Sequence, residues 1–209
     1  MTDATLTDAA APDATLTERG RRKADRRRAL LAAAATRFAE RGYAGVTIEE
    51  IGQAAGVSGP AVYRHFPGKA AVLAAILLDA SRSLLDGAER VAGEASDPAG
   101  ALRALIAHHV DFALAEADVI VVQDRELAHL DPVARHEVRA LQRRYVEHWV
   151  ATLGALRPGE PESELRVRAH AAFGLMNSTP HSARTPGRRP TRAVVRDLLE
   201  RMAWASLLA

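Results

Sequence analysis

The chain has 209 residues, 48% of them hydrophobic and 26% charged, enough for one large or two small globular domains with a buried core. It contains no cysteine, which excludes disulfide scaffolds, thiolate metal sites and cysteine nucleophiles. The longest strongly apolar uncharged run, residues 70–78, is too short to cross a bilayer, and the N-terminus lacks the basic-then-apolar order of a signal peptide. We therefore expect a cytoplasmic protein with no membrane partner.

Charge is unevenly distributed along the sequence. Residues 1–18 carry a net charge of −4, residues 19–69 carry +7 and residues 70–209 carry −1. This asymmetry predicts a polyanion-binding module joined to a nearly neutral one. The acidic start repeats Asp-Ala-Thr-Leu-Thr at 3–7 and 13–17 with too little apolar material to fold alone. We interpret residues 1–20 as a disordered acidic tail.

Apolar residues recur at helical spacing through the rest of the chain. Residues 119–122 form a β-branched run that would suit a strand, but no second strand candidate exists to pair with it, so we expect a helix there. The last two helices are expected at about 161–178 and 191–208, separated by a loop with three prolines and a glycine. The sequence thus predicts an all-α protein.

One short segment, residues 48–66, has the spacing of a helix-turn-helix. Thr47 with Glu50 makes a capping box that opens its first helix. Gly52 is small where two crossed helices come closest, and Gly56 supplies a turn residue with positive φ. A serine at 58 and a proline at 60 suit the N-terminus of the second helix.

The stretch from Gly56 to Lys69, Gly-Val-Ser-Gly-Pro-Ala-Val-Tyr-Arg-His-Phe-Pro-Gly-Lys, resembles the signature of TetR-type transcriptional regulators. Gly42-Tyr43 and Ile51 also fall where that family has them. The resemblance implies a three-helix helix-turn-helix DNA-binding domain over 21–68 and a helical ligand-binding and dimerisation domain over 69–209.

The resemblance also implies what the protein does. It would be a regulator, not an enzyme, that binds a palindromic double-stranded DNA operator as a homodimer formed through its last two helices. We expect the protein to repress transcription, and we expect a small effector bound in the second domain to release it from the DNA. The second domain resembles TetR-type regulators of actinobacterial lipid metabolism, some of which respond to acyl-CoA thioesters. This points to an apolar effector such as a fatty acid or acyl-CoA.

The same resemblance assigns DNA-binding residues. Phosphate contacts fall to four side chains, which are Thr47, Tyr63, His65 and Lys69. Base reading falls to the residues at the start and end of the second helix, which are Ser58, Gly59, Pro60, Ala61 and Arg64. Arg64 is suited to a bidentate contact with guanine.

A basic run over residues 19–28 precedes and opens the first helix. Arg21 and Arg22 are the members of this run that we include among the candidate DNA contacts. A flexible arm there would enter the minor groove or follow phosphates. A solvated charge run that only adds non-specific affinity is the alternative.

Aromatic and polar residues on the middle helices are candidates for the effector pocket, although helical spacing explains them equally as core. The residues selected are Phe112, Arg125, Tyr145, His148, Trp149, Phe173 and Asn177. Further polar groups near these stripes are His109, Gln123 and Glu126. The eight histidines have no metal-ligand spacing, so neither a metal nor another cofactor is expected.

Two other functions stay open from the sequence. A ligand-independent architectural DNA-binding protein would use the basic run, with its affinity governed by salt alone. A helical enzyme would keep its turnover after removal of residues 1–68, but no recognisable nucleophile constellation supports it.

Overall fold

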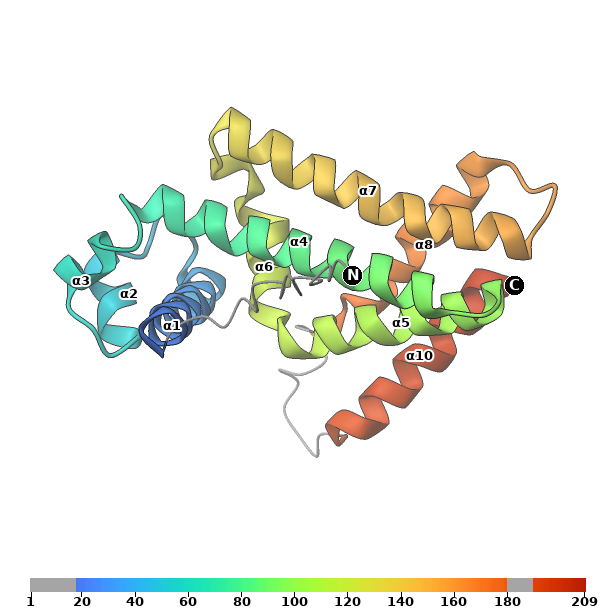
Figure 1. The fold of residues 1–209 in the computed structure, drawn as a ribbon, viewed down its shortest axis with the longest axis horizontal. Helices are drawn as coiled ribbons and strands as arrows, with labels where there is room; N and C mark the ends of the chain where they lie inside the picture. The colour runs from blue at the N-terminus through green and yellow to red at the C-terminus, as the bar shows by residue number, and fades with distance from the viewer. Residues whose placement is uncertain (1–17, 180–189) are drawn as a thin grey trace, which may run out of the picture.

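The computed structural model describes residues 18–179 and 190–209, and the regular structure within those ranges is entirely helical (Figure 1). The elements in chain order are α1 (Glu18–Arg41), α2 (Ile48–Ala54), α3 (Gly59–Tyr63), α4 (Lys69–Glu94), α5 (Pro98–Ala115), α6 (Ala117–Glu126), the 3-10 turn η1 (Leu127–His129), α7 (Pro132–Leu156), α8 (Glu162–Met176) and α10 (Arg192–Leu208). The all-α prediction is confirmed over the described residues. Most of the predicted tail, and most of the proline-containing loop predicted between the last two helices, lies outside them.

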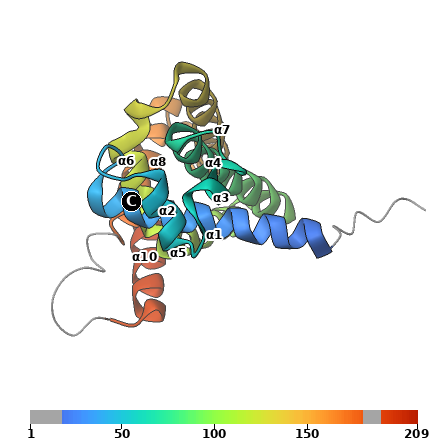
Figure 2. The ribbon, with the colours of Figure 1, turned by 90° about the vertical axis from the view of Figure 1, so that its left-hand side faces the viewer.

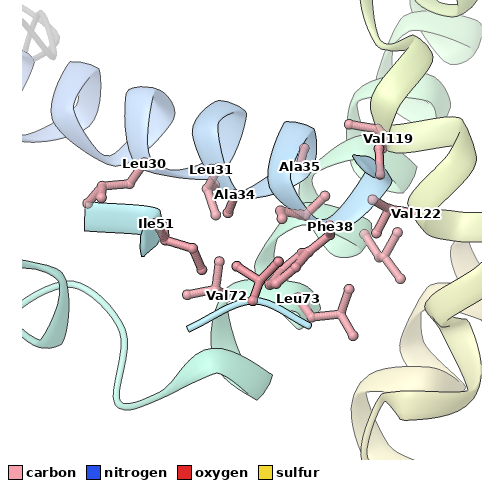
Figure 3. Packing of buried hydrophobic residues seen from close by; sticks show 14 of the residues in the cluster. Leu30, Leu31, Ala34, Ala35, Phe38, Ile51, Val72, Leu73, Val119 and Val122 are labelled. Atoms are coloured by element: carbon pink, nitrogen blue, oxygen red, sulfur yellow. The ribbon is translucent and has the colours of Figure 1, made fainter. Parts of the chain in front are cut away.

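The first three helices gather at one end of the molecule (Figure 1). Helix α1 ends where Gly42 adopts a φ of +75°, a left-handed conformation that only glycine adopts without strain. Its buried stripe, which includes Leu30, Ala34 and Phe38, packs on Ile51 of α2. Figure 3 shows these side chains converging below α1.

This N-terminal core also takes in residues from far along the chain. Val119 and Val122 of α6 reach the same cluster as Phe38 (Figure 3). Val138 of α7 belongs to this cluster as well. The run at 119–122 is helical, as predicted, and is buried throughout. The hydrophobic core therefore continues across residue 68, the expected boundary between the two domains.

A second core fills the other end of the molecule. Helix α4 runs out of the N-terminal domain and packs against α5 and α7, while α10 packs on α5 and α8 (Figure 1). Trp149 of α7 lies at the centre of this cluster with no exposed surface. Helices α5, α7 and α10 begin at side-chain caps from Asp97, Asp131 and Thr191. No helix among the described residues is long and apolar enough to span a membrane.

Candidate nucleic-acid interface and internal cavity

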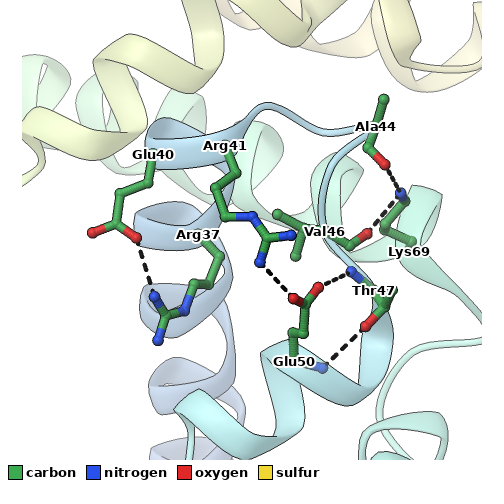
Figure 4. A network of polar contacts seen from close by, with 8 residues as sticks. All are labelled: Arg37, Glu40, Arg41, Ala44, Val46, Thr47, Glu50 and Lys69. Carbon is green, nitrogen blue, oxygen red and sulfur yellow. Dashed lines mark hydrogen bonds and ion pairs between the residues drawn. The ribbon is translucent and has the colours of Figure 1, made fainter.

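The helix-turn-helix is fixed at its start by the predicted capping box (Figure 4). The backbone N–H of Glu50 donates to the Thr47 hydroxyl at 3.2 Å, and the backbone N–H of Thr47 donates to the Glu50 carboxylate at 2.8 Å. An ion pair from Arg41 and the N–H of Thr47 lower the pKa of Glu50 to about 2. The carboxylate therefore stays ionised at neutral pH, and the Thr47 hydroxyl keeps a fixed position at the exposed N-terminus of α2.

Lys69 ties the turn after α1 to the start of α4 (Figure 4). Its ammonium donates to the carbonyl oxygens of Tyr43 at 2.7 Å and Val46 at 2.8 Å, and it lies 4.4 Å from the centre of the Tyr43 ring. The phosphate contact expected of Lys69 stays a prediction. Its first role in this structure is to hold the loop that carries Thr47.

The crossing of α2 and α3 depends on two glycines. A Cβ at Gly52 would lie 2.9 Å from the carbonyl oxygen of Val57 and 3.1 Å from a methyl of Val62, so only glycine fits without movement. Gly56 has a φ of +69° in the turn, as predicted. Ser58 occupies the N-cap of α3 but makes no side-chain capping hydrogen bond.

Helix α3 is short, and most of its predicted DNA contacts face solvent. Ser58, Pro60, Tyr63 and Arg64 are exposed, with Tyr63 at 53%, an unusual value for a large aromatic residue. The remaining three, Gly59, Ala61 and His65, are half-buried. Arg64 and His65 follow the last helical residue instead of lying within the helix. The α3 surface thus presents polar and aromatic groups to solvent, where an external partner can reach them.

The basic run is helical from Glu18 onward, which corrects the expectation of a flexible arm. Arg21 and Arg22 lie on the first turns of α1, which extend past the other helices (Figure 2). Arg22 pairs with Glu18, whereas Arg21 and Arg26 are exposed and have no ion-pair partner among the described residues. Local acids therefore neutralise only part of this charge.

A cavity of about 270 Å³ lies between the middle helices. Five helices line it, with Ser81 and Leu84 from α4, His109 and Phe112 from α5, Val119, Ile120 and Gln123 from α6, Gln142, Tyr145 and Val146 from α7, and His170 and Phe173 from α8. Asn177, the C-cap of α8, completes the lining. Phe112, Tyr145, Phe173 and Asn177 are candidates from the sequence, and the structure brings these four together.

A hydrogen-bonded chain crosses one wall of the cavity. His109 Nδ1 is 2.8 Å from the Tyr145 hydroxyl, and His109 Nε2 is 3.1 Å from Asn177 Oδ1. With the amide oxygen facing the ring, Nε2 carries the proton and Nδ1 accepts from Tyr145. Burial lowers the pKa of His109 to about 4 and raises the pKa of Tyr145, so both are neutral at pH 7. Phe173 stacks on His109 with ring centroids 5.0 Å apart.

The other three candidate residues do not line this cavity. Arg125 is exposed on the far side of α6, with Nη1 3.5 Å from the Ala39 carbonyl of α1. His148, one turn beyond Tyr145, faces Glu89 and a separate open groove near the end of α4. Trp149 packs behind His109 and Phe173, and its indole N–H has no acceptor among the described residues.

Sequence reasoning missed several cavity residues that a simple spacing rule would have found. Gln142 lies three residues before Tyr145, and His170 three residues before Phe173, so each shares a helix face with a candidate aromatic residue. Ser81 of α4 carried no signal in the sequence, because no candidate aromatic residue lies within one helical turn of it.

Glu126, considered as a ligand-orienting group, lies instead where α6 meets the helix-turn-helix domain. The residue is 6% exposed, and its carboxylate accepts from the backbone N–H of Tyr43 at 3.1 Å. His129 Nδ1 is 3.0 Å from the same carboxylate, and its ring lies 5.2 Å from the Tyr43 ring. We call Tyr43, Lys69, Glu126 and His129 the interdomain joint.

The exposed helix α3 lies on a cationic helix-turn-helix domain, and that domain is joined to a helical domain with a cavity. These features define a DNA-binding regulator. The comparisons with known proteins agree. The family model for bacterial regulatory proteins of the tetR family matches residues 30–76, and the model for the tetracyclin repressor-like C-terminal domain matches residues 95–203. The chain belongs to the TetR family of transcriptional regulators and is not an enzyme.

Individual relatives cover most of the chain. The HTH-type transcriptional repressor KstR2 of Rhodococcus jostii is 28% identical over 159 residues, which are 75% of this chain and 77% of KstR2. The structure of AibR in complex with isovaleryl coenzyme A and operator DNA has a TM-score of 0.68 at 22% identity, covering 85% of this chain and 97% of AibR. FadR of Bacillus subtilis with stearoyl-CoA has a TM-score of 0.65 at 15% identity, covering 86% of this chain and 98% of FadR.

Proposed function

We propose that this regulator is a repressor that binds a palindromic operator as a homodimer and is released by a small effector with an apolar body, such as a fatty acid or an acyl-CoA. The observation that carries the proposal is the position of α6. One face of this helix, with Ile120 and Gln123, lines the cavity, while Val122 and Glu126 contact the helix-turn-helix domain. A ligand that moves α6 therefore shifts the side chains on which the helix-turn-helix domain packs.

Helix α4 provides a second connection between the two sites. It begins at Lys69 in the interdomain joint and reaches the cavity with Ser81 and Leu84. A tilt of α4 would change the separation of the two α3 helices in a dimer. Because half-sites lie roughly 34 Å apart, one ligand state would fit the operator and the other would not.

The dimer proposal is supported by apolar side chains on the last helices. Val194, Leu198 and Met202 recur every four residues on α10 and are 55%, 47% and 45% exposed, and Val167 of α8 is 68% exposed. A stripe of this kind on a regular helix favours a second copy as its cover. We expect Leu198→Glu to convert the dimer to monomer in analytical ultracentrifugation. Val133→Glu, at an exposed apolar position on α7, should leave the dimer intact.

The DNA contacts are proposed as assigned by the sequence. Thr47, Tyr63, His65 and Lys69 bind phosphates, while Arg64 and the first turn of α3 read bases. Since α1 is helical from Glu18, its width of about 10–12 Å exceeds the roughly 6 Å of the minor groove. We therefore expect Arg21 and Arg22 to follow phosphates instead of entering the minor groove.

The test of the proposal is fluorescence anisotropy on the DNA directly upstream of the protein's own gene. At about 0.15 M salt with excess non-specific competitor, we expect saturable binding that survives the competitor. Tyr63→Ala should weaken binding to all sequences about equally, whereas Arg64→Ala should weaken it by about 1–3 kcal/mol and relax preference at one base pair. Wild-type operator affinity in both variants would contradict the proposed recognition surface.

A ligand-independent architectural role predicts a different result in the same assay. Its binding would be erased by competitor and governed by salt alone. The exposed α3 surface and the cavity favour the ligand-responsive regulator, because an architectural protein needs neither.

A further inference from the structure

The cavity has polar side chains on each of the five helices that line it, yet its described lining carries no ionisable acid or base other than histidine and tyrosine. None of these residues is Asp, Glu, Lys or Arg. The groups that could hydrogen-bond a ligand are hydroxyls, amides and imidazoles, contributed by Ser81, His109, Gln123, Gln142, Tyr145, His170 and Asn177. An ionised ligand group deep inside would therefore meet only neutral dipoles.

The buried histidine does not supply the missing charge. His109 is 3% exposed, and burial holds its pKa at about 4. Both of its ring nitrogens are already engaged, one by Tyr145 and one by Asn177. The other histidine of the cavity, His170, is exposed and lies edge-on to Phe173. The described lining of the cavity therefore places no lysine or arginine beside a ligand.

The amide groups, by contrast, retain free hydrogen-bonding capacity. Asn177 uses its oxygen toward His109, and its NH₂ group has no acceptor among the described residues. Gln123 and Gln142 are likewise half-buried with side-chain amides that make no hydrogen bond to another described residue. Such groups satisfy a carbonyl, ester or hydroxyl oxygen, whereas a carboxylate buried without a cation is strongly disfavoured or takes up a proton.

The size of the cavity limits what enters it. A volume of about 270 Å³ lies near the lower end of the range for small-molecule sites, roughly 300–1,000 Å³. It therefore suits the apolar part of an effector and not a whole coenzyme ester.

We propose that the cavity binds the uncharged, apolar portion of its effector through a neutral oxygen, and that it discriminates against a free carboxylate of the same size. This inference rests on the proposed function, in which the cavity is the effector site. An ester or a thioester fits this description. A free fatty acid does not, and an anionic headgroup attached to the ester stays outside.

The test uses two probes of about ten non-hydrogen atoms, methyl heptanoate and octanoate. The full chain is titrated with each by calorimetry at about pH 7.5, where octanoate is ionised. We expect the ester to bind at least tenfold more tightly than octanoate. Equal or tighter binding of octanoate would overturn the inference, and so would a failure of both probes to bind.

A charge introduced into the wall gives an independent check. Gln142→Lys places an ammonium at the cavity, and we expect it to raise the affinity for octanoate at least tenfold and to leave the ester without gain. His136→Lys adds the same charge to the exposed side of α7 and should change neither affinity. If the two lysine variants respond alike, the discrimination does not arise in this cavity.

Operator release separates this inference from the proposed function. Each probe is added to the protein–operator complex in the anisotropy assay. An ester that binds in calorimetry but leaves the operator bound would contradict the proposed function and uphold the chemistry of the cavity. Release of the operator by octanoate at a lower concentration than by the ester would uphold the proposed function. It would overturn the proposed discrimination of the cavity against a free carboxylate.

Discussion

The helix-turn-helix and the cavity use side chains in opposite ways. In the first, the candidate contacts Ser58, Tyr63 and Arg64 face solvent, and the core beneath them is built from other residues. In the cavity, His109 and Tyr145 are buried, so each residue is both part of the protein core and a candidate ligand contact. These exposed DNA contacts can therefore be changed with little loss of stability, whereas the buried cavity residues cannot.

The two regions also differ in how far apart their parts lie in the sequence. The capping box joins Thr47 to Glu50, and the close approach at Gly52 involves Val57 and Val62. The cavity joins Ser81 of α4 to Asn177, the C-cap of α8. A short sequence motif can encode the first arrangement but not the second.

The largest effect expected from this contrast is on stability. Trp149 packs behind the cavity residues His109 and Phe173 and has no exposed surface, so Trp149→Ala should lower the free energy of unfolding by about 3–5 kcal/mol. Tyr63→Ala, at a residue that is 53% exposed, should change it by less than about 0.5 kcal/mol while weakening DNA binding. Urea unfolding at one protein concentration measures both. A comparable loss of stability in the two variants would remove the contrast.

A second prediction concerns the local geometry of the helix-turn-helix. Gly52→Ala adds a Cβ that lies 2.9 Å from the Val57 carbonyl oxygen, so we expect stability to fall by about 1–3 kcal/mol and operator binding to weaken as α3 shifts. Gly93→Ala is the matched control. No heavy atom of the described residues crowds its Cβ, and the alanine should be neutral or stabilising by under about 1 kcal/mol. Full operator affinity in Gly52→Ala would show that the crossing tolerates movement.

A third prediction uses the buried histidine. Because the pKa of His109 is about 4 in the folded chain and near 6.5 when unfolded, only the unfolded state takes up this proton between those values. Stability therefore falls as the pH drops through that window, by about 1.5 kcal/mol from this residue between about pH 6.5 and pH 5. His109→Gln should remove this part of the pH dependence in urea unfolding.

The control for this effect is a histidine at the surface. His136 is exposed on α7, and His136→Gln should keep the pH dependence of the wild type. If the stability of wild type and His109→Gln depended on pH in the same way, His109 would take up its proton over the same pH range in the folded and the unfolded chain.

The smallest effect is expected from the basic start of α1. Arg21→Gln with Arg26→Gln should reduce the slope of log affinity against log salt by about 1 for each phosphate that the variant no longer neutralises, without changing base preference. Arg201→Gln, exposed on α10, should leave the slope unchanged. A change of base preference in the α1 variant would indicate that this helix reads sequence.

Much of the helix-turn-helix was predictable because its determinants are local. The capping box, the positive φ of Gly56 and the close approach at Gly52 follow from residues within a few positions of one another. The hydrogen bonds from Lys69 to the Tyr43 and Val46 carbonyls were not predictable. They join segments more than twenty residues apart, and no periodicity encodes such a meeting.

The cavity was predictable only in part, since helical spacing gives the face of a residue but not its neighbour. Tyr145 and Phe173 lie on predicted apolar stripes and do meet at the cavity, with ring centroids 5.6 Å apart. Arg125 and Glu126 were expected near the ligand, but the face of α6 that lines the cavity carries Ile120 and Gln123 instead. The packing of five helices decided which faces converge.

The sequence by itself determined the helices, the helix-turn-helix and the family, because capping, turn conformation and amphipathic spacing act over a few residues. Tertiary structure alone decided that α6 belongs both to the cavity wall and to the core of the DNA-binding domain. It also decided that the described lining of the cavity has no acidic residue, lysine or arginine. Both depend on which distant side chains pack together, and the free energy of burial favours apolar contact without specifying the partner.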